Sequence, residues 1–432
     1  MQVNKLLRYG ALAVFVGAGV GAAHADDATT TGGIKIKSSD GNFDASLGGR
    51  IHFDGLVNMP DNNDQKIGTG AAGDTGSDFE FRRVFVSLAG HLYGYEYHVD
   101  YDISNSGFQD VWIAHSLLPG GTIYIGQHKP WRSMDEIASN NSTPFMERNI
   151  VSANGIYGGN DYTEGAYYSW NHAAFGSSDN FWAGASGYSL HKQAAAAQAR
   201  TQGIGYNARV AYAPWVEQTS WLHAGVNFSS DNADTGSFGF KPSYTYGGRS
   251  GVTGFALASY AAAAGGNNPH QDALGAELAG AFGPAYGQAE FTRLSEHQEG
   301  KADNNINAYS VTGAWAITGE TRGYDKKNAT YVALRPAHSY GAFELAARYD
   351  YARNDGHGGA FVGMSEAGIT SGKNAAGGVV DQDSVSLITV GLNYYPNPAV
   401  RFMFNFTHGE AKFGDAGKDS PNSVGVRAQL VF

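Results

Sequence analysis

The sequence predicts an all-β fold, a transmembrane antiparallel β-barrel, and three observations support this prediction. Apolar and polar residues alternate in many segments of about ten residues, the length of a tilted membrane-spanning strand. Charged residues make up only 16% of the chain and aromatic residues 13%, whereas an ordinary soluble domain carries about 25% charged residues. After residue 25 no apolar run reaches the roughly 18 residues of a membrane-spanning helix, so any spans must be strands.

The first 25 residues are expected to be a signal peptide. Lys5 and Arg8 precede an apolar run, and Ala23-His24-Ala25 has the small-x-small form of a signal-peptidase site. An N-terminal anchor helix is the alternative, but the run is short and rich in Gly and Ala. We therefore expect residues 26–432 to form one barrel domain in the outer membrane of a Gram-negative cell.

Alternating segments follow one another along residues 26–432. The pattern favours a barrel over a soluble sandwich, because the segments have spanning length, aromatic ends, and short and long turns that alternate. The clearest polar faces, each opposed by an apolar face, are Arg50/His52/Asp54, Glu96/His98/Asp100/Asp102, Asn207/Arg209, Arg401/Met403/Asn405/Thr407 and Gly425/Arg427/Gln429.

Turn signals divide these segments into strands. Short turns are expected at 90–94, 118–121, 213–218, 282–285 and 395–398, and long loops at 58–77, 130–160, 261–271, 319–340 and 354–382. Seventeen segments are credible, and 252–260 is a doubtful eighteenth. Because single-chain bacterial barrels have even strand numbers, the pattern leaves sixteen or eighteen.

Composition also limits the function. The chain has no Cys and a formal net charge of −11, which becomes −13 without Lys5 and Arg8, so we expect no disulfides and no nucleic-acid partner. The 14 His are scattered, no Gly-x-Ser-x-Gly elbow occurs, and the Gly-rich pieces lack a following helix. We therefore expect no catalytic residues, no cofactor and no metal. Phe432 ends an alternating strand, which resembles the signal read by the barrel-assembly machinery.

Six segments carry recognisable motifs: Phe81-Arg82-Arg83-Val84-Phe85-Val86-Ser87-Leu88-Ala89-Gly90, Gln109-Asp110-Val111-Trp112, Ile123-Tyr124-Ile125-Gly126-Gln127-His128-Lys129-Pro130, Phe145-Met146-Glu147-Arg148, Phe343-Glu344-Leu345-Ala346-Ala347-Arg348-Tyr349 and Arg427-Ala428-Gln429-Leu430-Val431-Phe432. They resemble the phosphate-selective porins O and P, a family of trimeric, anion-conducting outer-membrane channels. The resemblance extends over nearly all of residues 26–432.

The resemblance implies sixteen strands, a homotrimer, and a loop at about 130–156 that folds into the lumen and constricts it. It also implies an anion-binding constriction, with Asp110 as the carboxylate beside Lys129. The candidate residues are Arg82, Arg83, Lys129, Arg132, Asp110 and Arg148. The constriction has fewer Lys and Ser than the family pattern, and His98 lies near where members can carry Lys, so strict phosphate selectivity stays open.

Further cations on the inward register could form a basic track that guides anions. They are Arg50, Lys241, Arg348, Arg401 and Arg427. Carboxylates occupy the same register, so a mixed, solvated lumen is the alternative. Because adjacent strand residues point to opposite faces, either Arg82 or Arg83 could instead reach the membrane interface, unless a bulge turns both inward.

These features favour an outer-membrane porin for passive diffusion of small anions, with phosphate or polyphosphate as the expected solute. A general-diffusion porin with weak selectivity is the alternative, and a non-conducting outer-membrane enzyme or adhesin is the second. The expected partners are two further copies of the chain, outer-membrane lipid and lipopolysaccharide, the barrel-assembly machinery and small anionic solutes.

Overall fold

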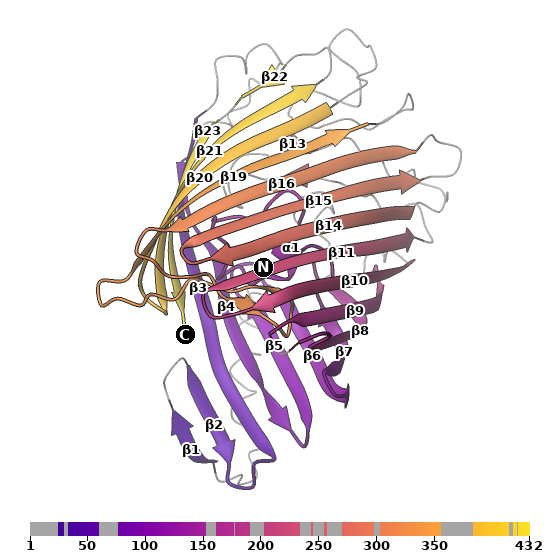
Figure 1. Ribbon diagram of the computed structural model, residues 1–432, viewed down its shortest axis with the longest axis vertical. Helices are drawn as coiled ribbons and strands as arrows, with labels where there is room; N and C mark the ends of the chain where they lie inside the picture. Colours follow the sequence, from indigo (N-terminus) through magenta and orange to yellow (C-terminus); the bar gives the residue numbers. More distant parts are fainter. Residues whose placement is uncertain are drawn as a thin grey trace, which may run out of the picture.

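The computed structural model describes residues 25–29, 33–59, 77–152, 161–176, 178–190, 203–233, 243–244, 255–256, 270–297, 303–355, 383–413, 418–420 and 422–432. Over these residues the chain forms a closed antiparallel barrel of sixteen strands (Figure 1). In chain order the strands are β3 (Phe43–Met59), β4 (Ser77–Leu92), β5 (Tyr95–Asp102), β6 (Gly107–Leu118), β7 (Gly121–His128), β8 (Thr163–His172), β9 (Asn180–Ser189), β10 (Gly203–Val216), β11 (Ser220–Ala233), β14 (His270–Phe282), β15 (Ala285–His297), β16 (Asn304–Ala316), β19 (Ala342–Asn354), β20 (Asp383–Asn397), β21 (Val400–Phe413) and β23 (Asn422–Val431).

The last strand closes the barrel on the first. β23 pairs with β3 in an antiparallel ladder that sets Arg427 opposite Asp54 and Leu430 opposite Ile51. Of the doubtful segment 252–260, the described part is β13 (Phe255–Ala256), which pairs with β12 (Ser243–Tyr244) outside the barrel sheet. The prediction of sixteen strands is confirmed. β22 (Lys418–Asp419) only extends the ladder of β21.

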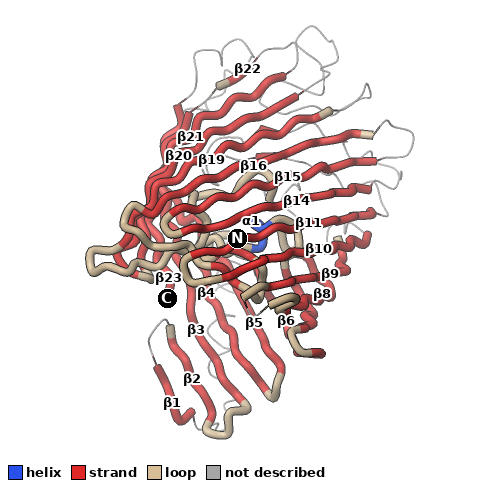
Figure 2. The backbone as a smooth tube through the Cα atoms, in the orientation of Figure 1, coloured by secondary structure: helices blue, strands red, loops and turns tan. Residues whose placement is uncertain are grey.

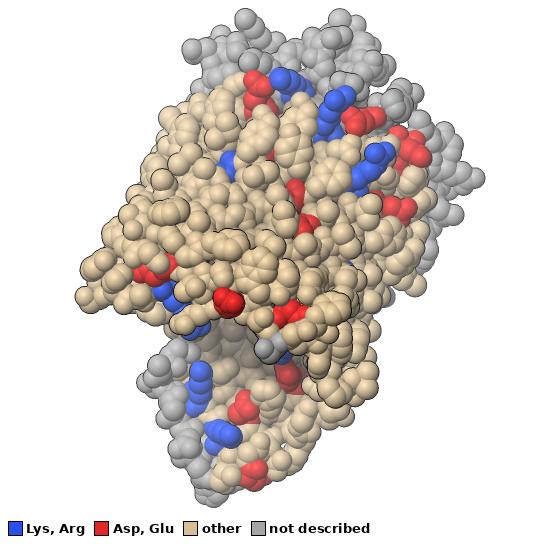
Figure 3. Space-filling view, viewed as in Figure 1, with Lys and Arg blue, Asp and Glu red and all other residues tan. Residues whose placement is uncertain are grey.

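The barrel is apolar outside and polar inside. On β14 the outward Leu274 and Leu278 are 59% and 53% exposed, whereas the inward Glu277 between them is 5% exposed. In Figure 3, Lys, Arg, Asp and Glu are sparse over the middle of the visible face and are more frequent toward its upper and lower ends. Exposed apolar side chains beside buried charges are the reverse of a soluble domain, so the predicted alternation between lipid and lumen is confirmed.

The connections differ in length between the two ends of the barrel. Two or three residues join β4 to β5, β6 to β7, β10 to β11, β14 to β15 and β20 to β21, as predicted. Both ends of the barrel sequence lie at this end, which is therefore the periplasmic one. The long connection at residues 317–341 also lies at the periplasmic end. It follows β16, the twelfth strand of the barrel, and in an antiparallel barrel every even strand in chain order ends on the same side as the short turns. The length of this connection alone could not show on which side it lies.

The chain termini extend or complete the wall. β2 (Ile34–Ser38) pairs with the start of β3, and β1 (Ala25–Thr29) pairs with β2 at the lower end of Figure 1. The N–H of Phe432 donates to the carbonyl oxygen of Gly49 at 3.0 Å, and the N–H of Gly49 donates back at 2.9 Å. The terminal residue is therefore part of the seam between the last strand and the first.

Two connections bond to inward side chains and to each other. Residues 129–152 carry α1 (Met134–Ile137), which lies amid the strands in Figure 2, and residues 317–341 carry β17 (Tyr324–Asp325) and β18 (Thr330–Tyr331). The hydroxyl of Tyr331 donates to Asp135 at 2.5 Å, and that of Thr330 donates to the carbonyl oxygen of Met134 at 3.2 Å. Among the described residues, no helix has the length and apolar character needed to cross a membrane.

Candidate functional site at the barrel interior

A β-bulge in β4 turns two adjacent arginines to the same side. His52 of β3 stands opposite Arg83 and Phe53 stands opposite Phe81, so Arg82 is the extra residue. A bulge re-aims the side chains around it, which removes the usual rule that neighbours on a strand face opposite sides. Both arginines therefore face the barrel interior, and the question left open by the sequence is answered.

Three guanidinium groups converge on one carboxylate, that of Glu147. Arg82 donates to it in a bidentate pair, with Nε and Nη2 each 2.9 Å from an oxygen. Nη2 of Arg427 donates at 3.0 Å, and Nη2 of Arg83 lies at 3.8 Å. Burial acts to raise the pKa of Glu147, but the three arginines outweigh it and hold that pKa well below its ordinary range. Glu147 is therefore ionised, and it is shared among three cations.

Two further arginines hold the backbone of the same segment. Nη1 of Arg348 donates to the carbonyl oxygen of Glu147 at 2.9 Å, and its Nε lies 2.7 Å from Asp350. Nη2 of Arg401 donates to the carbonyl oxygen of Thr143 at 2.8 Å. We call Arg82, Arg83, Arg348, Arg401 and Arg427 the arginine wall; they lie on β4, β19, β21 and β23.

Carboxylates on strands β11, β14 and β15 are buried on the inward register, and those of Asp231 and Glu290 bond to the segment. Asp231 accepts from Nη2 of Arg132 at 3.1 Å. Glu290 accepts from the N–H of Asp135 at 3.1 Å and from the side-chain amide of Asn149 at 2.6 Å. We call Asp231, Glu277 and Glu290 the acidic wall. Residues 129–152 are therefore bonded to strands on both walls. The strands donate to the segment on the arginine wall and accept from it on the acidic wall.

Lys129 lies at the start of this segment, but its partner differs from the predicted one. Its Nζ donates to the carbonyl oxygen of Glu136 at 2.8 Å and lies 3.5 Å from the Glu136 carboxylate. Burial, reinforced by Arg148, lowers the pKa of Lys129 to about 8, against the opposing effect of Glu136. Asp110, expected beside the lysine, instead has its nearest ion-pair contact with His128, at 3.6 Å. The register of β6 and β7 could not reveal that α1 supplies the closer carboxylate.

The remaining predicted cations are placed as follows. Arg148 donates from Nη2 to the carbonyl oxygen of Ala138 at 2.6 Å, inside the segment. Arg50 faces inward, 3.5 Å from Asp100, with its guanidinium carbon 3.9 Å from the centre of the Phe85 ring. Arg50, Arg348, Arg401 and Arg427 thus have the predicted inward register, and Lys241 lies outside the described residues.

The candidate site residues drawn from the sequence leave out several charged residues of the interior, although Arg209 was placed on a polar strand face. Arg322, from residues 317–341, pairs with Glu344, and Arg209 of β10 donates to Glu277 at 2.8 Å. Arg209 also donates to the carbonyl oxygen of Ala329 at 2.7 Å. The inward register of Arg209 was a signal for its place, but nothing local marked Arg322, because it depends on how its connection folds.

Some buried guanidinium N–H groups of the interior have no hydrogen-bond partner among the described residues. They include Nη1 of Arg83, Nε of Arg50 and Nε of Arg401. Buried donors are ordinarily satisfied, and an unsatisfied one costs about 1–3 kcal/mol. Each of these N–H groups would gain a missing hydrogen bond if water or an anion reached it.

Comparison with known proteins identifies the family. A sequence profile described as phosphate-selective porin O and P matches residues 47–432. The chain belongs to this family. Porin O of Pseudomonas aeruginosa is 24% identical over 98% of this chain and 97% of its own length. The family and the inside-out barrel together make the chain an outer-membrane porin.

Solved structures agree on the fold of this family member. The loop L8 deletion mutant of OmpT from Vibrio cholerae superposes with a TM-score of 0.54 at 11% identity, over 90% of this chain and 100% of that chain. The anion-selective porin from Comamonas acidovorans superposes with a TM-score of 0.54 at 13% identity, with the same coverage. At these identities the likeness shows the outer-membrane barrel fold alone.

Proposed function

We propose that this porin is a passive channel for small anions, with phosphate or polyphosphate as the solute, and that it is not an enzyme. One observation carries the proposal: Arg82, Arg83 and Arg427 share the single carboxylate of Glu147. Asp54 pairs with Arg427, Glu80 adds a negative charge near Arg82 and Arg148 adds a positive charge near Arg83, so four cations there face three carboxylates. An excess of fixed positive charge inside a barrel attracts anions and opposes cations.

Fixed guanidinium groups can replace the hydration that an anion loses in a narrow passage. An anion in a narrow passage loses part of its hydration, and fixed donors must replace it. A unit charge about 4 Å away contributes about 4 kcal/mol at an effective dielectric constant near 20. Guanidinium groups suit phosphate oxygens because their donors form a planar fork. Glu147, which already binds these arginines, would keep the site weak enough for release.

We propose residues 130–156 as the loop that narrows the lumen. The bonds of residues 132–149 to inward side chains on both walls support this, since only a segment inside the barrel reaches β11, β15 and β21 together. Residues 153–156 lie outside the described residues. Arg82, Arg83, Lys129, Arg132 and Arg148 would then surround the narrow region, with Asp110 at its edge.

Export and assembly belong to the same proposal. Residues 1–25 would be removed as a signal peptide, and Phe432 would be read by the barrel-assembly machinery. The mature chain would insert among outer-membrane lipid and lipopolysaccharide as a homotrimer. One solved OmpT of Vibrio cholerae, with a TM-score of 0.52 at 11% identity, is described as a trimer form.

A general-diffusion porin with weak selectivity is the second candidate, and a specific observation favours it. Inward arginines also have close carboxylates, as in the pairs Arg427–Asp54 at 2.6 Å and Arg348–Asp350 at 2.7 Å. Paired charges largely cancel at a distance, so the lumen would distinguish ions poorly.

Planar-bilayer recordings test the proposal. In a potassium chloride gradient, the mature protein should give stepwise conductance with a reversal potential that favours chloride, and millimolar phosphate should reduce the chloride current. Cation preference would overturn the anion assignment, and anion preference without phosphate block would favour general diffusion. Absence of conductance would favour the non-conducting enzyme or adhesin. In Lys129→Glu a large loss of chloride preference is expected, and no change would remove Lys129 from the site.

A further inference from the structure

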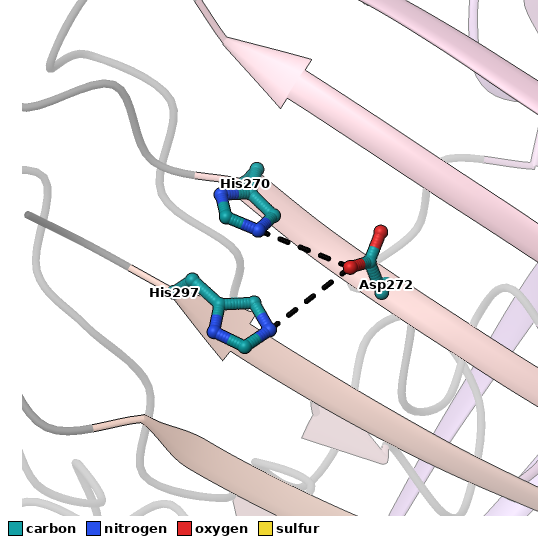
Figure 4. A group of neighbouring side chains, drawn as sticks. All are labelled: His270, Asp272 and His297. Carbon is teal, nitrogen blue, oxygen red and sulfur yellow. Dashed lines mark ion pairs between the residues drawn. The ribbon is translucent and has the colours of Figure 1, made fainter.

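Two histidines and an aspartate meet on the outer surface of the barrel, at the end away from the short turns (Figure 4). His270 and Asp272 lie two residues apart at the start of β14, so they share a face. His297 ends β15 and stands directly opposite His270 in the ladder. All three belong to the outward register, whose next member on β14 is the lipid-facing Leu274.

The three side chains converge on one position. Nε2 of His270 lies 3.8 Å from Oδ2 of Asp272, and Nε2 of His297 lies 4.0 Å from the same oxygen. Both distances exceed a hydrogen bond. Around a tetrahedral zinc ion with bonds of about 2.0–2.2 Å, ligand atoms stand about 3.3–3.6 Å apart. Small rotations of the exposed side chains would therefore place all three atoms around one ion.

A fourth residue fixes the orientation of one ligand. Nδ1 of His297 lies 2.8 Å from Oδ1 of Asp303, which leaves Nε2 directed toward Asp272. A carboxylate on the far nitrogen of a histidine is the arrangement that sets the tautomer and raises the basicity of metal-binding imidazoles. The rings of His270 and His297 stack with centroids 4.4 Å apart, which aligns them on one side of the carboxylate.

We propose that His270, Asp272 and His297 bind a divalent transition-metal ion such as Zn²⁺ on the outer face of the barrel, with Asp303 as a positioning residue. Two imidazole nitrogens and one carboxylate oxygen suit zinc, nickel or copper better than magnesium or calcium, which prefer oxygen ligands. Three protein ligands leave a coordination position for water. The ion would join β14 to β15 immediately above the lipid-facing residues.

This proposal differs from the expectation of no metal drawn from the sequence. His270-x-Asp272 is a common strand pattern, and its partner His297 belongs to another strand. Only the register of β14 with β15 brings the third ligand alongside, so spacing along the chain gave no signal.

Zinc binding to the untagged mature protein in detergent tests the proposal, with a fluorescent zinc chelator as competitor. One tightly bound Zn²⁺ per chain is expected, with affinity reduced at least tenfold in His270→Ala, His297→Ala and Asp272→Asn. Asp303→Asn should reduce it about tenfold or more, as is usual for a carboxylate behind a metal-binding histidine. Zinc should also raise the thermal unfolding temperature of the wild type and leave that of His297→Ala unchanged.

A matched control is available at the other end of the barrel. His91 and Asp44 form an exposed pair, 3.0 Å apart, with one histidine instead of two. His91→Ala should leave zinc affinity unchanged. Equal zinc affinity in the wild type and in His297→Ala would overturn the site, because the zinc would then be bound adventitiously elsewhere on the protein. Displacement of zinc by equimolar magnesium would overturn the assignment to a transition metal. His270, Asp272 and His297 are partly exposed and face away from the lumen, so their variants should fold and conduct normally.

Discussion

The two walls hold residues 129–152 by opposite means. On the arginine wall, strand guanidinium groups donate to the segment, to the carboxylate of Glu147 and to backbone carbonyl oxygens. On the acidic wall, strand carboxylates accept from the segment, from Arg132, Asp135 and Asn149. The interior therefore contains both signs of charge, and the side chains that hold the segment are cationic on one wall and anionic on the other. A net charge of −11 for the chain hides a cationic region around Glu147.

The largest expected effect comes from reversing a charge on the arginine wall. Arg83→Glu should lower the ratio of chloride to potassium permeability by about tenfold, since a change of about 1.4 kcal/mol in ion interaction corresponds to that factor. Arg83 is preferred over Arg427 because its contact with Glu147 is longer, 3.8 Å against 3.0 Å. Reversal potentials in dilute salt measure the ratio, because concentrated salt screens the effect.

Arg293→Glu is the matched control for this substitution. Arg293 lies on the exposed, outward register of β15, so the same change in charge should leave selectivity as in the wild type. An equal loss of chloride preference in Arg83→Glu and Arg293→Glu would show that the overall charge of the protein, rather than the arginine wall, sets the chloride preference.

Neutralising one carboxylate on each side sharpens the comparison. Glu147→Gln should raise chloride preference by about two- to fivefold, since its three arginines would lose their shared counter-charge at distances of about 3–4 Å. Glu290→Gln, on the acidic wall, should change the preference less, because Glu290 accepts hydrogen bonds from a backbone N–H and a side-chain amide, which carry no charge. A greater rise in chloride preference in Glu290→Gln than in Glu147→Gln would contradict this difference between the two walls.

The titration of Lys129 should add a smaller, pH-dependent effect. Its pKa is lowered to about 8, so the side chain is positive below that pH and becomes neutral as pH rises through it. Chloride preference should therefore fall between about pH 7 and pH 9. In Lys129→Arg the charge persists because guanidinium stays protonated, and the profile should be flat over this range. A wild-type profile as flat as that of Lys129→Arg would place the lysine away from the ion path.

Asp110→Asn should have the smallest effect. The carboxylate of Asp110 is 3.6 Å from His128, whereas Lys129 is paired with Glu136. Selectivity should therefore change less than in Glu147→Gln, measured in the same bilayer experiment. A larger change would restore Asp110 as the partner of the lysine.

The barrel itself could be predicted from the sequence because its signal is local. Period-two alternation assigns each side chain to lipid or lumen, and Arg50, Arg348, Arg401 and Arg427 were placed inward by that rule alone. The short turns followed from local residue types, as at Tyr93-Gly94, where both residues have positive φ.

Features that depend on two distant segments could not be predicted in this way. The bulge at Arg82 is visible only in the register of β4 against β3. Glu136 as the partner of Lys129, and Glu147 as the centre of three arginines, depend on how residues 129–152 fold against the strands. The pair Arg322–Glu344 likewise depends on how residues 317–341 fold.

Anomalous diffraction tests most directly whether the region around Glu147 attracts anions. Crystals of the mature protein would be soaked in bromide and, separately, in rubidium, so that each ion is located by its own scattering. Bromide should lie beside Nη1 of Arg83, one of the buried donors without a partner among the described residues, and rubidium should be absent there. Rubidium at that position, or bromide only on the acidic wall, would contradict an anion-selective interior.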